Sequence, residues 1–416
     1  MTERSLKSIS PDSITGMIFA MEGMKNSIVL LNGPMGCRFY HSTTSQFLSI
    51  RPALSLPAGN DRERVPVDYN YLNDWFFRQA RVPCTYLDGY DYVYSTKDKV
   101  SRALDYIRSS VDFDVISIVN SPGAALIGDN LLELAREKLG DCRVVMLESC
   151  GYSEGFEAGY SRACLELLRQ VGSFLWTDRP RPADGKKRVN LLGVSIWHRY
   201  MQGDVSELRR LFGLCGIQVN AVPCAECSIE ELRRLPDADL NVVLYPEMGL
   251  EAARYMEERC GQPYYVCPTL PIGFSAVERI FGEICSILGT WDGALKEESE
   301  RGRALCWYRI DQIHRSYGKP RGVKFCVKGG ESQERSYGAF LTDYLGMESA
   351  PPEKAELVFS DANVISELML RNRTFCGIEI SQPGMGYVDL VEKTHMGLQG
   401  ALFLVEQVLN GLMSKL

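Results

Sequence analysis

The sequence predicts an α/β fold with parallel sheets, divided among three units. Short runs rich in Val and Ile, each flanked by turn residues, indicate strands. Segments with apolar residues at three- and four-residue spacing lie between these runs and indicate helices. Because strand and helix alternate along the chain, we expect the strands to pair in parallel. Two charged segments that contain Pro and Gly interrupt the alternation and separate the units.

The expected strands are short and begin near the N-terminus. They are residues 26–32 (NSIVLLN), 114–120 (DVISIVN), 143–148 (RVVMLE), 188–194 (RVNLLGV), 217–222 (IQVNAV), 240–245 (LNVVLY), 323–327 (VKFCV) and 375–380 (FCGIEI). A further strand is expected just before Cys267. The clearest helical patterns cover residues 97–109, 129–139, 206–214, 250–260 and 397–409.

The boundaries between units fall in polar segments. Residues 177–188 (TDRPRPADGKKR) are charged and contain proline, and an apolar strand follows them directly. A long polar helix that ends near Gly318 and Pro320 is typical of a connector. Residues 41–81 carry aromatics without a clear period, so we expect a functional or partner-binding insertion there. The predicted division is an N-terminal domain over residues 1–185, a second domain over 186–295, a connecting helix over 296–317 and a third domain over 318–416.

Composition and charge exclude several classes of protein. The 46 Lys and Arg residues are interspersed among 53 Asp and Glu residues, with a net charge of -7, which argues against a nucleic-acid-binding surface. No apolar stretch reaches the ~20 residues of a membrane span, and the N-terminus lacks the apolar core of a secretory signal. We therefore expect a cytoplasmic protein with no membrane partner. Its 14 cysteines are expected to be reduced, some binding metal, in an oxygen-poor cytoplasm.

Three cysteines stand where an apolar run gives way to glycine or proline. Cys37 ends VLLNGPMGC, Cys84 lies in RVPCTYLDGY and Cys150 ends VVMLESC. The carboxyl ends of parallel strands meet at one edge of a sheet, so these thiolates are expected to meet around one metal cluster. Glycines before Cys37 would let the backbone approach a bulky cluster closely. The alternative is that each cysteine is an ordinary buried thiol.

Longer segments carry a resemblance to a known family. They are KNSIVLLNGPMGC, DYVYSTKDKVSRAL, NSPGAALIGDNL and ESCGYSEGFEAGY in the first domain, LNVVLYPEMGLEAARYMEERCGQPYYVCPTLPIG in the second, and GYVDLVEKTHMGLQGALFLVEQVLN near the C-terminus. Their order and spacing resemble the nitrogenase component 1 superfamily, which includes catalytic subunits, cofactor-assembly scaffolds and tetrapyrrole reductases. The resemblance covers nearly the whole chain and implies three Rossmann-like domains around a central cleft.

The resemblance also implies an iron–sulfur cluster between two related subunits, to which each subunit offers up to three cysteines. Cys37 matches one of these positions, whereas the other two fall on Asp12 and on Ser121 or the next residue. A carboxylate binds iron less softly than a thiolate, and such ligation is known among the tetrapyrrole reductases. Cys84 and Cys150 are expected to replace the missing thiols. The three thiolates of Cys37, Cys84 and Cys150 predict a [4Fe-4S] cluster at a subunit interface, with one coordination site on iron left for another ligand.

A second group of thiols begins with Cys224 and Cys227, a CxxC pair directly after the run IQVNAV. Two thiols at this spacing can bind one metal or cluster, or cycle as a dithiol. Cys267 is expected to approach them, which predicts a possible second cluster; the alternative is that all three are unligated. The other cysteines are interpreted as core or surface thiols: Cys142, Cys164, Cys215, Cys260, Cys285, Cys306, Cys326 and Cys376.

The residues that hold the molybdenum–iron cofactor of nitrogenases are not matched. The position of its cysteine falls on Leu244 or Tyr245, and that of its histidine falls within residues 386–388. Dinitrogen reduction on a cofactor held in the usual way is therefore not expected. His198, in SIWHRY, is the candidate proton donor or cluster contact, with a packing role as the alternative. His41 is expected to tune the cluster through a hydrogen bond.

The function implied by the resemblance is that of one subunit of a nitrogenase-like reductase. A separate dimeric, ATP-dependent iron–sulfur protein would deliver electrons, because this chain has no Walker-type phosphate loop and is expected to bind no nucleotide. A homologous or identical component 1 subunit would complete a dimer or tetramer. A small molecule would be the substrate. The alternative is a scaffold that assembles or transfers a metal cluster without turnover.

Overall fold

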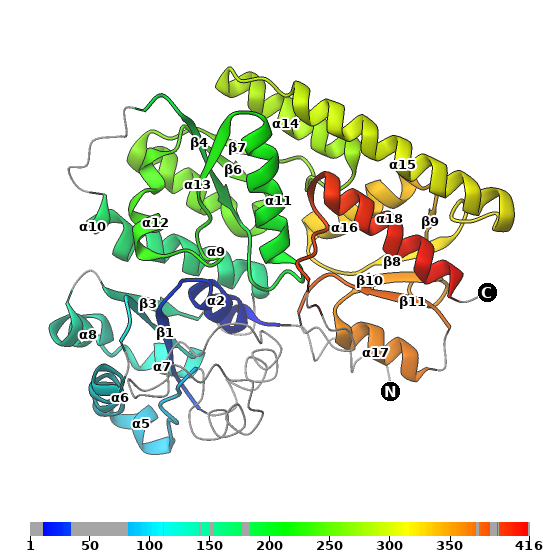
Figure 1. Cartoon of the computed structure of the whole chain (residues 1–416). Helices are drawn as coiled ribbons and strands as arrows, with labels where there is room; N and C mark the ends of the chain where they lie inside the picture. Colours follow the sequence, from blue (N-terminus) through cyan, green and yellow to red (C-terminus); the bar gives the residue numbers. More distant parts are fainter. Residues whose placement is uncertain are drawn as a thin grey trace, which may run out of the picture. The chain divides into compact units, whose positions relative to one another are not determined.

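The chain forms two compact units (Figure 1). The computed structural model describes residues 11–34, 82–110, 112–140, 143–149, 154–176, 184–371, 374–382, 389 and 391–414. The first unit contains Ser10–Pro180 and Pro223–Arg234, and the second contains Arg181–Val222 and Leu235–Leu416. Residues 223–234 therefore belong to the first unit, although the sequence on either side of them belongs to the second.

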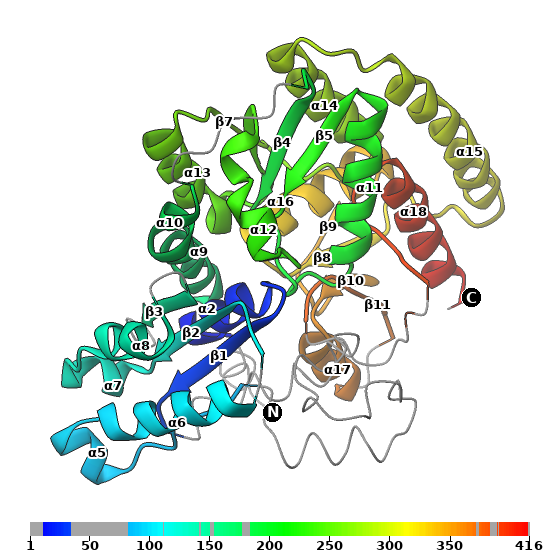
Figure 2. The same cartoon turned by 60° about the vertical axis from the view of Figure 1, so that its left-hand side comes forward.

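A three-stranded parallel sheet forms the centre of the first unit (Figure 2). Its strands, in spatial order, are β1 (Ser27–Asn32), β2 (Val115–Asn120) and β3 (Val144–Glu148). The helical elements are α2 (Ser13–Glu22), α5 (Gly89–Tyr94), α6 (Lys97–Ser110), α7 (Pro122–Ile127), α8 (Leu131–Leu139), α9 (Phe156–Leu167), the π-helical turn η4 (Leu168–Gly172), α10 (Ser173–Leu175) and α12 (Ile229–Arg233). α6 and α8 cover one face of the sheet through an apolar cluster, and α2 and α9 cover the other. Every residue of β1 and β2 is therefore buried.

α2 and α9 approach each other closely because glycines face the contact. A Cβ atom on Gly16 would lie 2.0 Å from Phe156 O, and one on Gly159 would lie 2.0 Å from Ser13 O. No side chain fits at either position. The glycines thus set the distance between the two helices that cover this face of the sheet.

Residues 223–234 are fastened to the first unit by backbone and side-chain hydrogen bonds. Cys227 N donates to Gly23 O at 3.1 Å, and Lys25 N donates to Cys227 O at 2.8 Å. Trp176 Nε1 donates to Leu232 O at 3.0 Å. This segment therefore completes the first unit around the end of α2.

The second unit contains two four-stranded parallel sheets, with the orders β5-β4-β6-β7 and β11-β10-β8-β9. The strands are β4 (Lys187–Leu192), β5 (Ile217–Ala221), β6 (Leu240–Val243), β7 (Tyr264–Val266), β8 (Lys324–Val327), β9 (Glu348–Ser349), β10 (Leu357–Ser360) and β11 (Cys376–Glu379). The helical elements are α11 (Met201–Leu214), η5 (Leu235–Asp237), α13 (Pro246–Cys260), α14 (Phe274–Leu288), α15 (Gly293–Tyr317), α16 (Glu331–Ala339), η6 (Phe340–Tyr344), α17 (Ala362–Leu370) and α18 (Gly397–Met413). The C-terminal helix α18 packs on α11, α14 and α15 and also contacts β10 and β11, so it connects the helices beside the first of these sheets with the second sheet.

The predicted α/β class with parallel sheets is confirmed, because every pairing between these strands is parallel. One sheet lies within each predicted domain range, and α15 covers the predicted connecting helix. The chain nevertheless forms two compact units, and the three-domain limits stay a prediction. The sequence patterns do not predict β9 and β10. The predicted insertion at residues 41–81 lies outside the described residues.

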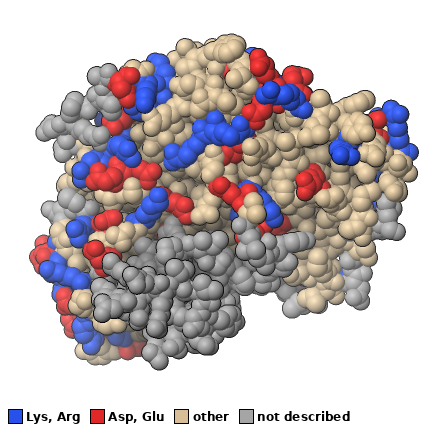
Figure 3. Space-filling model, in the orientation of Figure 1, with Lys and Arg blue, Asp and Glu red and all other residues tan. Residues whose placement is uncertain are grey.

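On the face shown in Figure 3, the described surface has no large patch of only positive or only negative charge, because Lys and Arg side chains are interspersed with Asp and Glu. In the part of the chain that the structure describes, no helix is long and apolar enough to cross a bilayer.

Candidate functional site

The carboxyl ends of the strands in the first sheet lie in one row. In the parallel register Asn32 of β1 faces Asn120 of β2, and Asn120 faces Glu148 of β3. Ser121 N donates to Asn32 O at 2.9 Å, and Ser149 N donates to Asn120 O at 3.2 Å, so the residues after β2 and β3 stay in this row. This row, called the carboxyl edge below, is where the sequence predicts a cluster.

Cys84 lies beside the end of β1, on the side away from β2. It forms a parallel bridge with Leu31, and its thiol donates to Gly33 O at 3.1 Å. Tyr86 N donates to the sulfur at 3.5 Å. The Cys84 side chain is partly exposed, so it is accessible at the carboxyl edge.

Buried polar side chains hold the backbone next to Cys84 in place. Asn32 Nδ2 donates to Asn120 Oδ1 at 2.9 Å and to Thr96 Oγ1 at 3.2 Å. Thr85 Oγ1 donates to Asn32 Oδ1 at 2.9 Å, and Gly33 N donates to Thr85 Oγ1 at 3.1 Å. Sequence reasoning missed this network, although an Asn ends each of the first two predicted strands. The network fixes the position of the candidate thiol relative to β1.

Asp12 and Ser121, two of the predicted site residues, both serve as helix N-caps. Asp12 Oδ1 accepts hydrogen bonds from Thr15 N at 2.9 Å and Thr15 Oγ1 at 2.8 Å. Ser121 Oγ accepts from Ala124 N at 3.4 Å. The bonds to Asp12 use one of its two carboxylate oxygens, which leaves the other oxygen chemically able to bind a metal.

The donor types described at the carboxyl edge, a thiol and a carboxylate, are ones that iron–sulfur clusters accept, but Cys84 lies at the β1 edge of the sheet and Asp12 near the end of β3. Ser13 Oγ lies 3.4 Å from Ser149 Oγ, so the end of α2 that carries Asp12 lies where β3 ends. Cys150 directly follows Ser149, and both Cys150 and Cys37 lie outside the described residues. Thiolates are the usual ligands of such clusters, and a carboxylate can take one position on iron. Among the described residues, no three His, Cys, Asp or Glu side chains converge on one point, so these donors alone do not complete a site.

Cys224 and Cys227 lie at the opposite end of β1 from Cys84. Their loop pairs with the residues just before β1 begins. The six-residue strand spans about 20 Å, so these thiols do not share a cluster with Cys84. Both side chains are buried, and a hydrogen bond with Cys164 raises the pKa of the Cys224 thiol, which therefore stays protonated.

Cys267 belongs to the second unit, whereas Cys224 and Cys227 belong to the first. Burial raises the pKa of the Cys267 thiol. The second cluster on these three thiols stays a prediction.

His198 follows β4 and packs against Tyr245, which follows β6. The two rings stack with 4.0 Å between their centroids and 17° between their planes. Ser195 N donates to His198 Nδ1 at 3.3 Å, so the neutral ring carries its proton on Nε2. Burial lowers the pKa of His198 to about 3, so the ring is neutral near pH 7. The strand order reverses between β4 and β6, which is where open α/β sheets usually bind ligands.

A buried carboxylate in the second unit was not predicted. Asp204 Oδ1, on α11, accepts from Thr394 Oγ1 at 2.7 Å and from His395 N at 2.9 Å. It also accepts from Met396 N at 3.1 Å, just before α18 begins. Burial raises the pKa of Asp204 to about 6. This carboxylate therefore fastens the start of α18 to α11.

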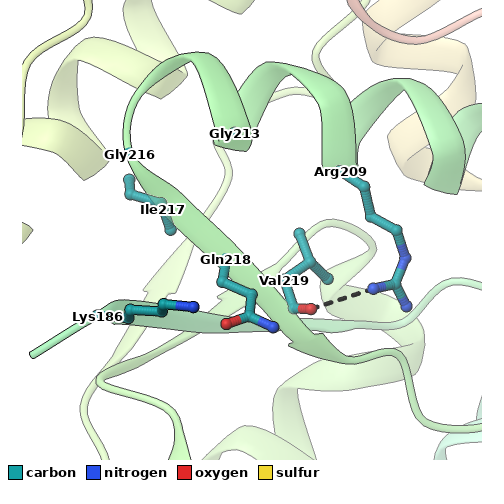
Figure 4. Close-up of a pocket in the computed structure, with 7 residues that line it drawn as sticks. All are labelled: Lys186, Arg209, Gly213, Gly216, Ile217, Gln218 and Val219. Carbon is teal, nitrogen blue, oxygen red and sulfur yellow. Dashed lines mark hydrogen bonds between the residues drawn. The ribbon is translucent and has the colours of Figure 1, made fainter. Parts of the chain in front are cut away.

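A pocket of about 410 Å³ lies at the amino ends of β4 and β5 (Figure 4). Arg209 Nη1 donates to Val219 O at 3.1 Å and so covers the outer edge of β5. No predicted site residue lines this pocket. Its lining residues are Lys186, Arg209, Gly213, Gly216, Ile217, Gln218 and Val219.

The model of nitrogenase component 1 type oxidoreductases matches residues 13–350 of the chain. The chain therefore belongs to this family, as the sequence resemblance predicted. In overall structure it is similar to the nitrogenase Cp1 solved at pH 6.5, with a TM-score of 0.69 and 15% identity over 98% of this chain and 92% of that one. This likeness confirms the three-domain Rossmann-like architecture of the fold.

Two curated relatives are named as a subunit of light-independent protochlorophyllide reductase. The protein from Synechococcus sp. (strain WH7803) is 32% identical over 242 residues, which cover 56% of this chain and 45% of the relative. The protein from Halorhodospira halophila (strain DSM 244 / SL1) is 32% identical over 198 residues, covering 45% of this chain and 37% of the relative. The chain thus spans about half the length of the curated relatives it matches.

Proposed function

We propose that the chain is one subunit of a nitrogenase-like reductase, with a [4Fe-4S] cluster at the carboxyl edge of its first sheet. The observation that carries the proposal is the carboxyl edge itself, where Cys84 lies beside β1 and the Asp12 end of α2 lies where β3 ends. Cys37 and Cys150 follow the same strands in the sequence. Ser121 and Asp12 take the positions at which the family usually has cysteine. When bound, such a cluster supplies low-potential electrons one at a time.

The proposed partners are a homologous or identical component 1 subunit, which shares the cluster, and a dimeric ATP-dependent iron–sulfur protein, which delivers electrons. Exposed aromatic side chains that follow Cys84 in the chain support a protein partner near this edge. Tyr86, Tyr90 and Tyr94 are 50%, 70% and 68% exposed, and the rings of Tyr90 and Tyr94 lie 4.4 Å apart. Apolar surface of this kind is typical of an interface.

The proposed substrate is a small unsaturated molecule rather than dinitrogen on a conventionally held cofactor. By the sequence resemblance, Leu244 or Tyr245 stands where that cofactor would need a cysteine, and the ring of Tyr245 is stacked on His198. The name of the curated relatives says that they reduce protochlorophyllide, which supports a reductase with an organic substrate. His198 is neutral and carries its proton on Nε2, so it would donate a hydrogen bond to substrate rather than act as a cationic acid.

Iron and sulfide analysis after anaerobic purification tests the cluster. We expect Cys37→Ala, Cys84→Ala and Cys150→Ala each to lose more than half of the bound iron, and Asp12→Ala to change the electron paramagnetic resonance signal of the reduced cluster. Cys326→Ala, at a buried thiol of β8, is the matched control and should keep full iron content. If all three cysteine variants keep full iron, the ligand assignment is wrong.

A scaffold that assembles or transfers a cluster without turnover is the second candidate function. Substrate-dependent ATP consumption in the presence of the ATP-dependent iron–sulfur protein separates the two. A reductase consumes ATP with substrate and keeps its iron, whereas a scaffold gives its iron to an acceptor protein and consumes none.

A further inference from the structure

Two buried thiols of the second unit lie against each other where α11 and α14 meet. Cys215 directly follows α11 and Cys285 lies in the last turn of α14, and each is 3% exposed. One turn earlier on each helix, the ring centroids of Phe212 and Phe281 lie 4.5 Å apart. Cys215 and Cys285 extend the contact between the two helices by one turn, and their thiols are hydrogen-bonded to each other.

The two thiols are chemically unequal. Donation from the Cys215 thiol lowers the pKa of Cys285 to about 7, and the same bond raises the pKa of Cys215. Lys296 also favours the Cys285 thiolate, whereas Asp292 opposes it, and these two residues form an ion pair of 3.0 Å. Cys285 is therefore a nucleophile near neutral pH, and Cys215 is the thiol next to it.

The residues that follow Cys285 in the chain reach the surface, although the two thiols themselves are buried. Ile287, two residues after Cys285, is 54% exposed, and Trp291 is 72% exposed. The other hydrogen-bonded thiol pair described, Cys164 with Cys224, has 2% and 0% exposure, and the bond raises the pKa of Cys224 well above its ordinary value.

We propose that Cys285 and Cys215 are a peroxide-responsive modification site that closes reversibly to a disulfide. The Cys285 thiolate attacks one peroxide oxygen, the O–O bond breaks, and a sulfenic acid and water form. Cys215 then attacks the sulfenic sulfur, an S–S bond replaces the S–O bond, and a second water leaves. In total, two thiols and one hydrogen peroxide give one disulfide and two waters, so the two sulfurs supply the two electrons that reduce the peroxide. The site shares no residue with the proposed cluster, so either proposal can fail alone.

Peptide mapping of the full chain tests the site. The anaerobically purified protein is treated with increasing hydrogen peroxide, remaining thiols are blocked with N-ethylmaleimide, and peptides are identified by mass spectrometry. We expect a Cys215–Cys285 linked peptide that disappears on reduction with a phosphine. Its initial rate of formation should rise about tenfold between pH 6 and pH 8, as the thiolate fraction of Cys285 grows.

Variants assign the roles of the two thiols. Cys215→Ser should leave a sulfenic acid on Cys285 that dimedone traps, and Cys285→Ser should leave Cys215 unreacted. Cys306→Ser, at a thiol of α15 that is 4% exposed, is the matched control and should form the linked peptide as the wild type does. Wild-type protein in which Cys285 reacts no faster than Cys306, or in which no linked peptide forms, would overturn the proposal whatever the iron content.

Discussion

At the scale of single residues, the buried carboxylate of Asp204 connects α11 to the start of α18, but burying its charge costs stability. All three of its hydrogen bonds arrive at the same oxygen, Oδ1, from the residues that lead into α18. Burial disfavours the charged form and Glu207 repels it, so the pKa of Asp204 is raised to about 6. The folded state therefore binds a proton more tightly than the unfolded chain, and the contribution of Asp204 to stability falls as pH rises through 6.

Asp204→Asn should keep the acceptor at Oδ1 and remove the buried charge. We expect a thermal unfolding midpoint at pH 7 that equals or exceeds the wild-type value, with the difference shrinking as pH falls from 6 toward 4. Asp204→Ala is the contrasting variant, because it leaves the donors before α18 without an acceptor and should be about 2 kcal/mol less stable than Asp204→Asn at every pH. An Asn variant as unstable as the Ala variant would contradict this account. Scanning calorimetry at pH 5, 6 and 7 provides the comparison.

At the scale of elements, the contact between α2 and α9 depends on the absence of side chains at two positions. Gly159→Ala would push a methyl group into Ser13 O, which belongs to the backbone of α2 and cannot move aside alone. We expect a loss of about 2 kcal/mol or more in unfolding free energy, because overpacking shifts the helices apart. The measurement is urea denaturation followed by circular dichroism.

Gly338→Ala is the matched control for that experiment. Gly338 also lies in a helix, α16, but a Cβ atom there would meet nothing within 4 Å. Alanine at an open helical position should be neutral or stabilising by up to about 1 kcal/mol. Equal effects of the two substitutions would show that the close approach of α2 and α9 does not matter.

The elements that sequence reasoning found are those with a strong local pattern. Buried strands such as β1 and β2 are continuous apolar runs between turn residues, so the sequence predicts their ranges within a residue or two. β10 (LVFS) lies at the centre of its sheet but is four residues long and follows a charged segment, so no local pattern marks it. α2 is buried on all sides and carries no polar face, so the usual helical spacing is absent.

The candidate site was predictable to the same extent. Parallel strands bring the residues after them to one edge, and that rule predicts Cys84 at the carboxyl edge, although Cys84 directly follows no described strand and its bridge with Leu31 beside β1 was not predicted. The pairing of Asn32 with Asn120 depends on register between strands, which single-sequence patterns do not specify. Cys224 and Cys227 lie at the other end of β1 because residues 223–234 belong to the first unit, whereas the residues on either side of them in the sequence belong to the second. No local sequence pattern indicates this.

At the scale of the whole molecule, three buried titratable groups among the described residues, His198, His395 and Asp204, contribute to the response to acid. His395 Nδ1 pairs with Tyr337 OH at 2.8 Å and Nε2 with Gln407 Oε1 at 2.7 Å, and burial lowers the pKa of His395 to about 3, as it does for His198. Both histidines are neutral in the folded state and gain protons near pH 6.5 in the unfolded chain, so their contribution to stability falls as pH drops below 6.5. Asp204 acts in the opposite direction between pH 6 and 4, and therefore offsets part of this loss.

Taken together, the pKa shifts of His198, His395 and Asp204 predict that the protein is less stable in acid. From these three groups we expect the unfolding free energy to be lower at pH 5 than at pH 7 by about 2 to 3 kcal/mol. His395→Gln should reduce this pH dependence, whereas His314→Gln, at an exposed position of α15, should leave it unchanged. Urea midpoints measured at both pH values provide the test. A wild-type protein that is equally stable at pH 5 and pH 7 would show that the histidines do not remain neutral on folding.

The path of residues 223–234 has a consequence for synthesis on the ribosome. The loop with Cys227 and the helix α12 fasten the end of α2 and Trp176, yet they are translated only after β4, α11 and β5 of the other unit. The N-terminal unit therefore cannot complete its hydrogen bonds when residue 180 leaves the exit tunnel. It must wait, partly assembled, until the chain has passed residue 234, and a fragment cut at residue 180 would lack the same contacts. The order of folding thus departs from the order of translation in this chain.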